Sequence, residues 1–445
     1  MLLLALLLAS PLAPAFGATT LTSTSTSPIK HVFIFVEENH TFDNFFGTYP
    51  GVNGISYAKA QPNPNGTTVV PGVLPRATIA KDLCHSTQCA RTDLANGTMD
   101  GFMKGEKSNM TMGYFDPKLI PYYWDYASQY VLMDNYYTPM LGPSLPNHIY
   151  MLAGQAGGLL INNSTFKLTF PTIVDNLDAA HVSWTYYAGG HSTTNGWNPL
   201  PSSPTYVKAH PGLTGLKETA DFQYDLLKPN FPSVAWVMPP ADDMSEHPPY
   251  NVTAGQLNIV NDVNLIMKSQ YWSSSAIIIT WDDYGGWYDH ASPPQLDQYG
   301  LGFRVPTLII SPFAKHGFVD HTLSEHSSTL KFIETTFHVP ALGTRDVNPK
   351  IGDLTEAFTF EQVPRHALVM PGAFVPNHYP LKYPNGTLLG PPPLGQPGVL
   401  SGSNSVPDLE YAGLLLMTVT ALVVFLGVVT TRKRAGEMPA DSAPG

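Results

Sequence analysis

The 445-residue chain contains little charge, because only 13% of its residues are Asp, Glu, Lys or Arg. Soluble proteins usually contain about 25%, so each cluster of charged side chains is more informative here than usual. The formal net charge is −11, and no run of basic residues occurs before the C-terminal region. This composition argues against a nucleic-acid partner, which requires a positively charged surface.

Cysteine is also scarce, with only Cys84 and Cys89 in the whole chain. Two cysteines are too few for a structural zinc site. They are close enough to close one loop as a disulfide if the protein is outside the cell. A pair of free thiols is the alternative.

An apolar run without charged residues occurs near each end of the chain. The apolar run Leu2–Ala9, followed by small residues up to Ala18, is typical of a secretory signal, although a basic start is lacking and an uncleaved anchor is the alternative. Ala412–Thr431 contains 20 residues without a charge, enough for one membrane-spanning helix, and "RKR" follows directly. The positive-inside rule places that basic tail in the cytoplasm and the preceding chain outside. A buried core helix is the alternative.

Glycosylation sequons agree with an extracellular location. Eight N-x-[ST] sites are present, at Asn39, Asn65, Asn96, Asn109, Asn162, Asn163, Asn251 and Asn385. Each site alone is weak evidence, but their density fits a secreted glycoprotein. We exclude Asn39, which we expect to be buried.

Strand-like and helix-like segments alternate between the two ends. The predicted strands are 31–37, 181–187, 233–239, 276–283 and 305–312, and the predicted helices are 121–131, 146–155, 254–270 and 324–337. This alternation predicts one α/β domain around a largely parallel sheet. The segment 371–407 has nine prolines without periodicity, which is typical of a stalk, and no internal repeat is present.

Paired oxygen ligands follow two of the apolar strands. Glu38 and Asn39 follow the first, and Asp282 and Asp283 follow "AIIITW". Ligands of open α/β sheets bind beyond the carboxyl ends of strands, and clustered carboxylates are usually stabilised by a divalent cation. Helix capping or a solvated turn could explain either pair alone, but two such pairs favour a metal site.

Ser144 lies in "GPSLPNH", between a Gly-Pro turn and a predicted helix. A hydroxyl at a helix N-terminus faces free N–H groups that favour phosphate, and a cation could activate it as a nucleophile. A plain N-cap serine is the alternative. Among the fifteen histidines, several lie in polar loops and could bind phosphate or protonate a leaving alcohol: His85, His191, His247, His290 and His326.

Five motifs occur in an order that resembles the phosphoesterase family of bacterial phospholipases C and secreted acid phosphatases, within the alkaline phosphatase superfamily. The motifs are "EENHTFDNFFGTYPGV", "DLCHSTQC…NGTMDGF", "GPSLPNHIYMLAG", "SEHPP" and "TWDDYGGWYDHASPP". The resemblance implies an alkaline-phosphatase-like fold, a largely parallel sheet flanked by helices. It also implies a hydrolase acting on phosphoric esters.

The resemblance assigns roles to individual residues. It implies that Glu38, Asn39, Asp282 and Asp283 bind one divalent metal ion, that Ser144 is the nucleophile with His85 and His247 contacting the phosphoryl group, and that His290 contributes to substrate binding. Oxygen ligands suit Mg²⁺, Ca²⁺ or Mn²⁺, while nearby histidines would admit Zn²⁺ or Fe. Serine at 144 and aspartate at 283 depart from many of the phospholipases and favour the acid-phosphatase branch.

The sequence therefore predicts an extracellular phosphoric ester hydrolase, acting on phosphate esters or phospholipids and attached to the cell membrane by one C-terminal helix. A glycoprotein that has lost catalysis, or a glycosidase using Glu38, are the alternatives. The predicted segments are a signal peptide (1–18), a Ser/Thr-rich leader (19–28), the catalytic domain (29–370), a Pro/Gly-rich stalk (371–410), the membrane helix (411–431) and a cytoplasmic tail (432–445).

Overall fold

The computed structural model describes residues 27–79, 81–188 and 197–371. The predicted signal peptide, nearly all of the leader, the stalk beyond Pro371, the membrane helix and the cytoplasmic tail lie outside these residues. No helix within the described part of the chain is long and apolar enough to cross a membrane.

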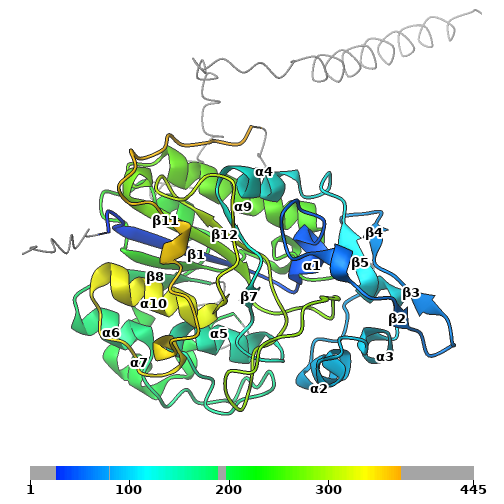
Figure 1. Ribbon diagram of the computed structural model, residues 1–445. Helices are drawn as coiled ribbons and strands as arrows, with labels where there is room; N and C mark the ends of the chain where they lie inside the picture. Colours follow the sequence, from blue (N-terminus) through cyan, green and yellow to red (C-terminus); the bar gives the residue numbers. More distant parts are fainter. Residues whose placement is uncertain (1–26, 80, 189–196, 372–445) are drawn as a thin grey trace, which may run out of the picture. The chain divides into compact units, whose positions relative to one another are not determined.

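An eight-stranded sheet lies at the centre of the structure, in the order β13-β6-β12-β11-β1-β10-β8-β9 (Figure 1). Its strands are β1 (His31–Glu37), β6 (Val131–Met133), β8 (Trp184–Tyr187), β9 (Leu216–Lys217), β10 (Val234–Val237), β11 (Ser275–Trp281), β12 (Thr307–Ile310) and β13 (Phe318–Asp320). Three two-stranded sheets are formed by β2 (Gln61–Pro62) with β3 (Thr68–Val69), β4 (Gly72–Leu74) with β5 (Gly113–Phe115), and β7 (Tyr136–Tyr137) with β14 (Ser324–Glu325).

The five strands β11, β1, β10, β8 and β9 are parallel, which confirms the prediction of an α/β fold with a largely parallel sheet. Strand β12 differs, because it is antiparallel to both β11 and β6. A parallel neighbour requires a crossover, usually a helix. The connection from Asp282 to Pro306 contains no helix, so β12 returns along β11 in the opposite direction.

Helices cover both faces of this sheet. In Figure 1, α4 and α9 lie above the sheet, and α5, α6, α7 and α10 lie below it. The helices are α1 (Phe42–Phe46), α2 (Thr87–Leu94), α3 (Phe102–Glu106), α4 (Pro121–Gln129), α5 (Ser144–Ala153), α6 (Ile173–Ala179), α7 (Pro204–Ala209), α8 (Asp221–Asp225), α9 (Val252–Lys268) and α10 (His326–Phe337). All four predicted helices are present, with ends shifted by at most two residues.

The two central strands explain the position of the site. Every side chain from Val32 to Val36 is buried, as is all of β11, since helices pack on both faces. Burying one such side chain stabilises the fold by about 1.5–3 kcal/mol. The strand ends are therefore among the most rigid points of the chain, and whatever follows them is held firmly.

Candidate active site

The carboxyl ends of β1 and β11 lie side by side. The two strands are parallel, with Glu37 opposite Trp281, so Glu38 and Asp282 leave the sheet at the same level. The backbone N–H of Asn39 donates a hydrogen bond of 3.2 Å to Asp282 Oδ1. The structure thus brings together the two pairs that the sequence placed at strand ends.

A glycine allows this close approach. Gly285 has a φ of +60°, and a Cβ atom there would lie 2.2 Å from the carbonyl oxygen of Asn39. No side chain fits at that distance, so the turn after Asp283 packs its backbone directly against Asn39. Asn39 itself has a φ of +64°, a left-handed conformation that asparagine tolerates better than most residues.

Ser144 is the first residue of α5, and its hydroxyl is buried at the same place. Ser144 Oγ donates a hydrogen bond of 3.2 Å to Asp283 Oδ2. The N-cap position is occupied by Pro143, and the serine side chain does not cap the helix. The interpretation of Ser144 as a plain N-cap is therefore wrong. The side chain of Asn147 fixes the preceding turn by donating to the carbonyl oxygens of Gly142 and Pro143, both at 3.3 Å.

Several polar atoms around Asp282 are buried without a hydrogen-bond partner. They are Glu38 Oε1, Asp282 Oδ2 and both side-chain atoms of the Asn39 amide. Buried polar atoms are nearly always paired in proteins, so each such group requires an explanation. Carboxylate and amide oxygens are the donors that hard divalent cations prefer. These residues fit a cation site.

The protein itself offsets only part of the charge of this cluster. Burial lowers the pKa of His148, but Asp282 and Glu38 outweigh this effect and raise it to about 9, so His148 supplies one positive charge. Burial, followed by the charge of Asp282, raises the pKa of Glu38 to about 7. Burial and the same charge raise the pKa of Asp283 well above its usual range. For Asp282, burial acts upward, but interaction with His148 outweighs it and lowers the pKa to about 2. The site therefore favours an added positive charge.

His148 is a residue of this site that sequence reasoning missed. Its ring is fully buried, and Nε2 lies 3.7 Å from Glu38 Oε1 and 3.6 Å from Asp282 Oδ2. The signal was its spacing, since residues four apart in a helix share one face and His148 follows Ser144 by four. His326, one of the candidate histidines named from the sequence, also reaches the site through Nε2, 3.3 Å from the carbonyl oxygen of Asp282.

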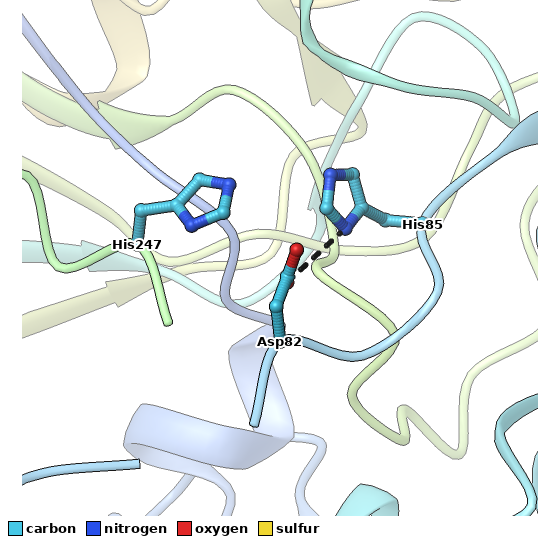
Figure 2. Close-up of side chains that lie close together, drawn as sticks. All are labelled: Asp82, His85 and His247. Atoms are coloured by element: carbon cyan, nitrogen blue, oxygen red, sulfur yellow. Dashed lines mark ion pairs between the residues drawn. The ribbon is translucent and has the colours of Figure 1, made fainter. Parts of the chain in front are cut away.

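His85 and His247 lie together on separate loops, with Asp82 between them (Figure 2). Their ring centroids are 5.6 Å apart with an edge-to-face arrangement, and Asp82 Oδ1 is 3.6 Å from His85 Nδ1. In each histidine Nδ1 contacts a backbone carbonyl, of Leu83 at 3.0 Å and of Pro248 at 2.5 Å. The tautomer that donates from Nδ1 leaves Nε2 of both rings free for a ligand.

The carboxylates of the cluster also affect the pKa of His247. Burial lowers its pKa, but the nearby carboxylate of Glu38 and the carbonyl of Pro248 outweigh this effect, so the pKa is raised overall. The loop of His85 is closed by a disulfide between Cys84 and Cys89, whose Cα atoms are 6.0 Å apart. This confirms the predicted disulfide and excludes the free-thiol alternative.

Residues 29–340 match the phosphoesterase family. The chain belongs to that family. It is accordingly a hydrolase acting on phosphoric esters, as the sequence predicted.

Curated members of the phosphoesterase family are similar over most of this chain. Phospholipase C B of Mycobacterium tuberculosis is 27% identical, over 76% of this chain and 78% of its own length. Non-specific phospholipase C6 of Arabidopsis thaliana is 25% identical, over 76% of this chain and 73% of its own. A solved structure from Vibrio parahaemolyticus, in the alkaline phosphatase superfamily, has 13% identity and a TM-score of 0.37, with coverage of 73% and 72%. At that score the likeness carries no argument about chemistry.

His290, predicted to bind substrate, lies in a different cluster of this phosphoesterase. Its Nδ1 and backbone N–H contact Asp43 Oδ2 at 2.7 and 2.9 Å, and its Nε2 contacts Asn53 at 3.0 Å. Arg304, fully buried, donates to Asp43 at 3.1 Å and to Asp289 at 3.0 Å. These hydrogen bonds pair the side chains with one another and connect α1 to the segment before β12. The arrangement is that of a structural brace.

Proposed function

We propose that this phosphoesterase is metal-dependent and uses Ser144 as a nucleophile that forms a phosphoserine intermediate. The observation that carries the proposal is the Ser144 Oγ–H bond to Asp283, beside buried carboxylate and amide oxygens that have no partner. A nucleophile needs activation, and a cation-binding pocket next to a buried hydroxyl is one way to provide it.

A divalent cation would be held by Glu38, Asn39, Asp282 and Asp283, and it would act as a Lewis acid that favours the deprotonated form of Ser144 and offsets phosphoryl charge. The residues fit such an ion because each offers a side-chain oxygen, all four are buried, and they follow two buried strands. The hydrogen bond to Asp283 fixes the Ser144 side chain in one direction before substrate binds.

In the proposed reaction, Ser144 acts first, and His85 and His247 then assist the departure of the alcohol. Ser144 Oγ loses its proton to solvent and attacks phosphorus, and the P–O bond to the alcohol breaks. His85 and His247, in their protonated forms, donate from Nε2 to phosphoryl oxygens, and one of them gives its proton to the leaving alcohol. Water then attacks the phosphoserine, restores Ser144 and releases phosphate or a phosphorylated head group.

The substrate class is a phosphoric ester outside the cell, either a phosphomonoester or the head group of a phospholipid. Relatives named as phospholipases C favour the phospholipid, whereas Ser144 and Asp283 favour the monoester. A panel of phosphomonoesters, phosphodiesters and phosphatidylcholine, assayed with and without chelator, distinguishes the two. Activity that resists chelation would contradict metal dependence, and no activity on any ester would favour the inactive glycoprotein.

We further propose that the catalytic domain is extracellular and attached to the membrane by residues 411–431. The proposal is supported by the uncharged run, the sequon density and the Cys84–Cys89 bridge. The full chain should sediment with membranes, whereas a version ending at Val406 should be soluble and active. A full chain that stays soluble after signal removal would contradict the membrane attachment.

Substitution and trapping of the serine test the mechanism. Ser144→Ala should lower turnover by orders of magnitude, because water alone must then attack the ester. Acid quenching of the wild type during turnover should leave phosphate on a peptide spanning residues 140–154. The control is Ser128→Ala, which changes an exposed serine in α4 and should leave the rate unchanged. Near-normal activity of Ser144→Ala would mean that water attacks phosphorus directly.

A further inference from the structure

The buried histidines at this edge of the sheet differ in whether their ring nitrogens have hydrogen-bond partners. His40 contacts Asn44 Oδ1 at 2.7 Å and the carbonyl oxygen of Glu246 at 3.1 Å. His326 contacts Tyr136 Oη at 3.4 Å and the carbonyl oxygen of Asp282 at 3.3 Å. His148 is equally buried, yet neither of its ring nitrogens has a hydrogen-bond partner among the described residues. Hydrogen bonds within the core account for the first two rings, whereas His148 faces the carboxylates of Glu38 and Asp282.

The surroundings of His148 Nε2 are also unusual. The two nearest acidic oxygens, Glu38 Oε1 and Asp282 Oδ2, are 3.7 and 3.6 Å away, which is too far for a hydrogen bond. Both oxygens lack any other partner. Two ligands about 2.1 Å from one ion at tetrahedral angles are separated by about 3.4 Å. The spacing of these three atoms matches that of ligands around a shared ion, and it also lies within the limit of about 4 Å for an ion pair, so the measurements below are chosen to separate the two.

Helix geometry supports the same arrangement. His148 follows Ser144 by four residues in α5, so both side chains extend from one face of the helix towards the ends of β1 and β11. The helix is buried along its whole length. Packing therefore fixes the directions of its side chains. Metal ligands need such fixed positions, which a rigid element provides.

We propose that His148 Nε2 is a direct ligand of the metal ion, which makes the site one for a first-row transition metal such as Mn²⁺, Fe²⁺ or Zn²⁺. This inference rests on the proposed metal dependence and narrows it. Carboxylate and amide oxygens alone suit Mg²⁺ or Ca²⁺, which bind imidazole poorly, whereas a nitrogen donor favours the transition metals.

Pulsed electron paramagnetic resonance on the full-length protein loaded with Mn²⁺ tests the assignment directly. The wild type should show nitrogen modulation from a coordinated imidazole, and His148→Gln should lose it. His326→Gln is the matched control, because it removes a neighbouring buried ring whose nitrogens are both occupied. That variant should keep the modulation.

Equilibrium binding of Zn²⁺ and Ca²⁺ provides a second measurement. His148→Gln should raise the Kd for Zn²⁺ by about 100-fold. The Kd for Ca²⁺ should rise by at most about tenfold, because Zn²⁺ gains more than Ca²⁺ from a nitrogen ligand. Should His148→Gln fail to fold, the wild-type spectrum alone still decides. Mn²⁺ bound without nitrogen coupling overturns the role of His148 and leaves metal dependence intact. A wild type that binds none of the three cations overturns both.

Discussion

Ser144 Oγ lies 3.2 Å from Asp283 Oδ2, although the two residues are 139 positions apart and belong to a helix and a strand end. The helix supplies the hydroxyl, and the strand ends supply the carboxylates. The nucleophile and the carboxylate ligands are therefore held by separate elements. Substitutions on one element should leave the other in place, so the two functions can be separated by experiment.

Asp282→Asn should lower both the metal content and the rate, since it removes an anionic oxygen that is buried and unpaired. Glu38→Gln should act in the same way. Ser144→Ala should instead lower the rate and leave the metal content unchanged. Metal analysis of the three purified variants beside their rates checks this pattern. Full metal content in Asp282→Asn would show that this carboxylate is no ligand.

The Cys84–Cys89 disulfide should matter more for activity than for stability. The bridge closes a very short loop, so its entropic stabilisation is at most about 3 kcal/mol. However, it restrains His85, which lies between the two cysteines in sequence. The double variant Cys84→Ser/Cys89→Ser should lose catalytic efficiency at least tenfold, with a small change in melting temperature. A role in placing His85 would be contradicted if the loss of catalytic efficiency merely followed the loss of stability, or if only stability were lost.

His290 and His247 should respond differently to alanine. His290→Ala removes contacts to Asp43 and Asn53, and we expect a loss of about 1–3 kcal/mol in the free energy of unfolding with KM nearly unchanged. His247→Ala should leave stability nearly unchanged and lower kcat/KM by at least about 100-fold. Chemical denaturation and steady-state kinetics measure both. A large rise in KM for His290→Ala would restore its predicted role in substrate binding.

The brace around Arg304 gives a sharper stability test. Asp43 and Arg304 are both buried, and Asp43→Asn weakens the charged hydrogen bonds of Asp43 with Arg304 and His290, while Asp289 still pairs with Arg304. Asp43→Asn should therefore cost about 1.5–3 kcal/mol in the free energy of unfolding. The exposed pair Lys315–Glu356 is the control, and Glu356→Gln should cost less than about 1 kcal/mol. Similar losses in the two variants would show that the brace contributes little.

The sequence predicted the meeting of Glu38 with Asp282 because apolar runs of β-branched and aromatic residues identify buried strands, and parallel strands end at one edge. It could not predict the antiparallel direction of β12, which depends on how the segment 282–306 folds. His148 was missed for a physical reason. It lies in a helix that is buried on all sides, so its four-residue spacing from Ser144 was the signal in the sequence, and the distances to Glu38 and Asp282 show what it contacts.

The motif containing His290 shows that neighbours in sequence can have different partners in the structure. Its sequence neighbours Asp283 and Gly285 belong to the site, and proximity in sequence suggested that His290 does too. The chain turns after Gly286, however, and Asp43 and Asn53 bind the ring elsewhere. Short helices such as α1, α2 and α3 were not predicted either. A helix of five to eight residues is too short for a periodic signal, and tertiary packing stabilises it instead.

The carboxyl groups of Asp93 and Glu106 form a buried pair beneath the His85 loop. Tyr284 Oη donates to Asp93 Oδ2 at 2.8 Å, and the backbone N–H of Cys84 donates to Glu106 Oε2 at 2.6 Å. Their other oxygens, Asp93 Oδ1 and Glu106 Oε1, have no hydrogen-bond partner. Burial, and then the neighbouring carboxyl, raise the pKa of Asp93 to about 9, and burial raises the pKa of Glu106 to about 7.

These shifts predict that the pair makes the protein less stable as the pH rises. Between about pH 4 and the raised pKa values of about 7 and about 9, the folded state binds protons that the unfolded state has released. The contribution of the pair to stability is therefore complete below about pH 4 and is lost as the pH rises through this window. Asp93→Asn removes one of the two ionisations, and its amide can donate to the free oxygen of Glu106.

Asp93→Asn should therefore match the wild type within about 1 kcal/mol at pH 5 and exceed it in stability at pH 8.5. Thermal unfolding at pH 5, 7 and 8.5 measures this difference, and comparison at each pH cancels the titration of every other group. Asp100→Asn is the control, because it removes an exposed carboxylate from the same segment and should leave the pH profile of the wild type unchanged. If Asp93→Asn is less stable than the wild type by the same amount at all three values, Asp93 is ionised in the folded state throughout and the two carboxyl groups share no proton.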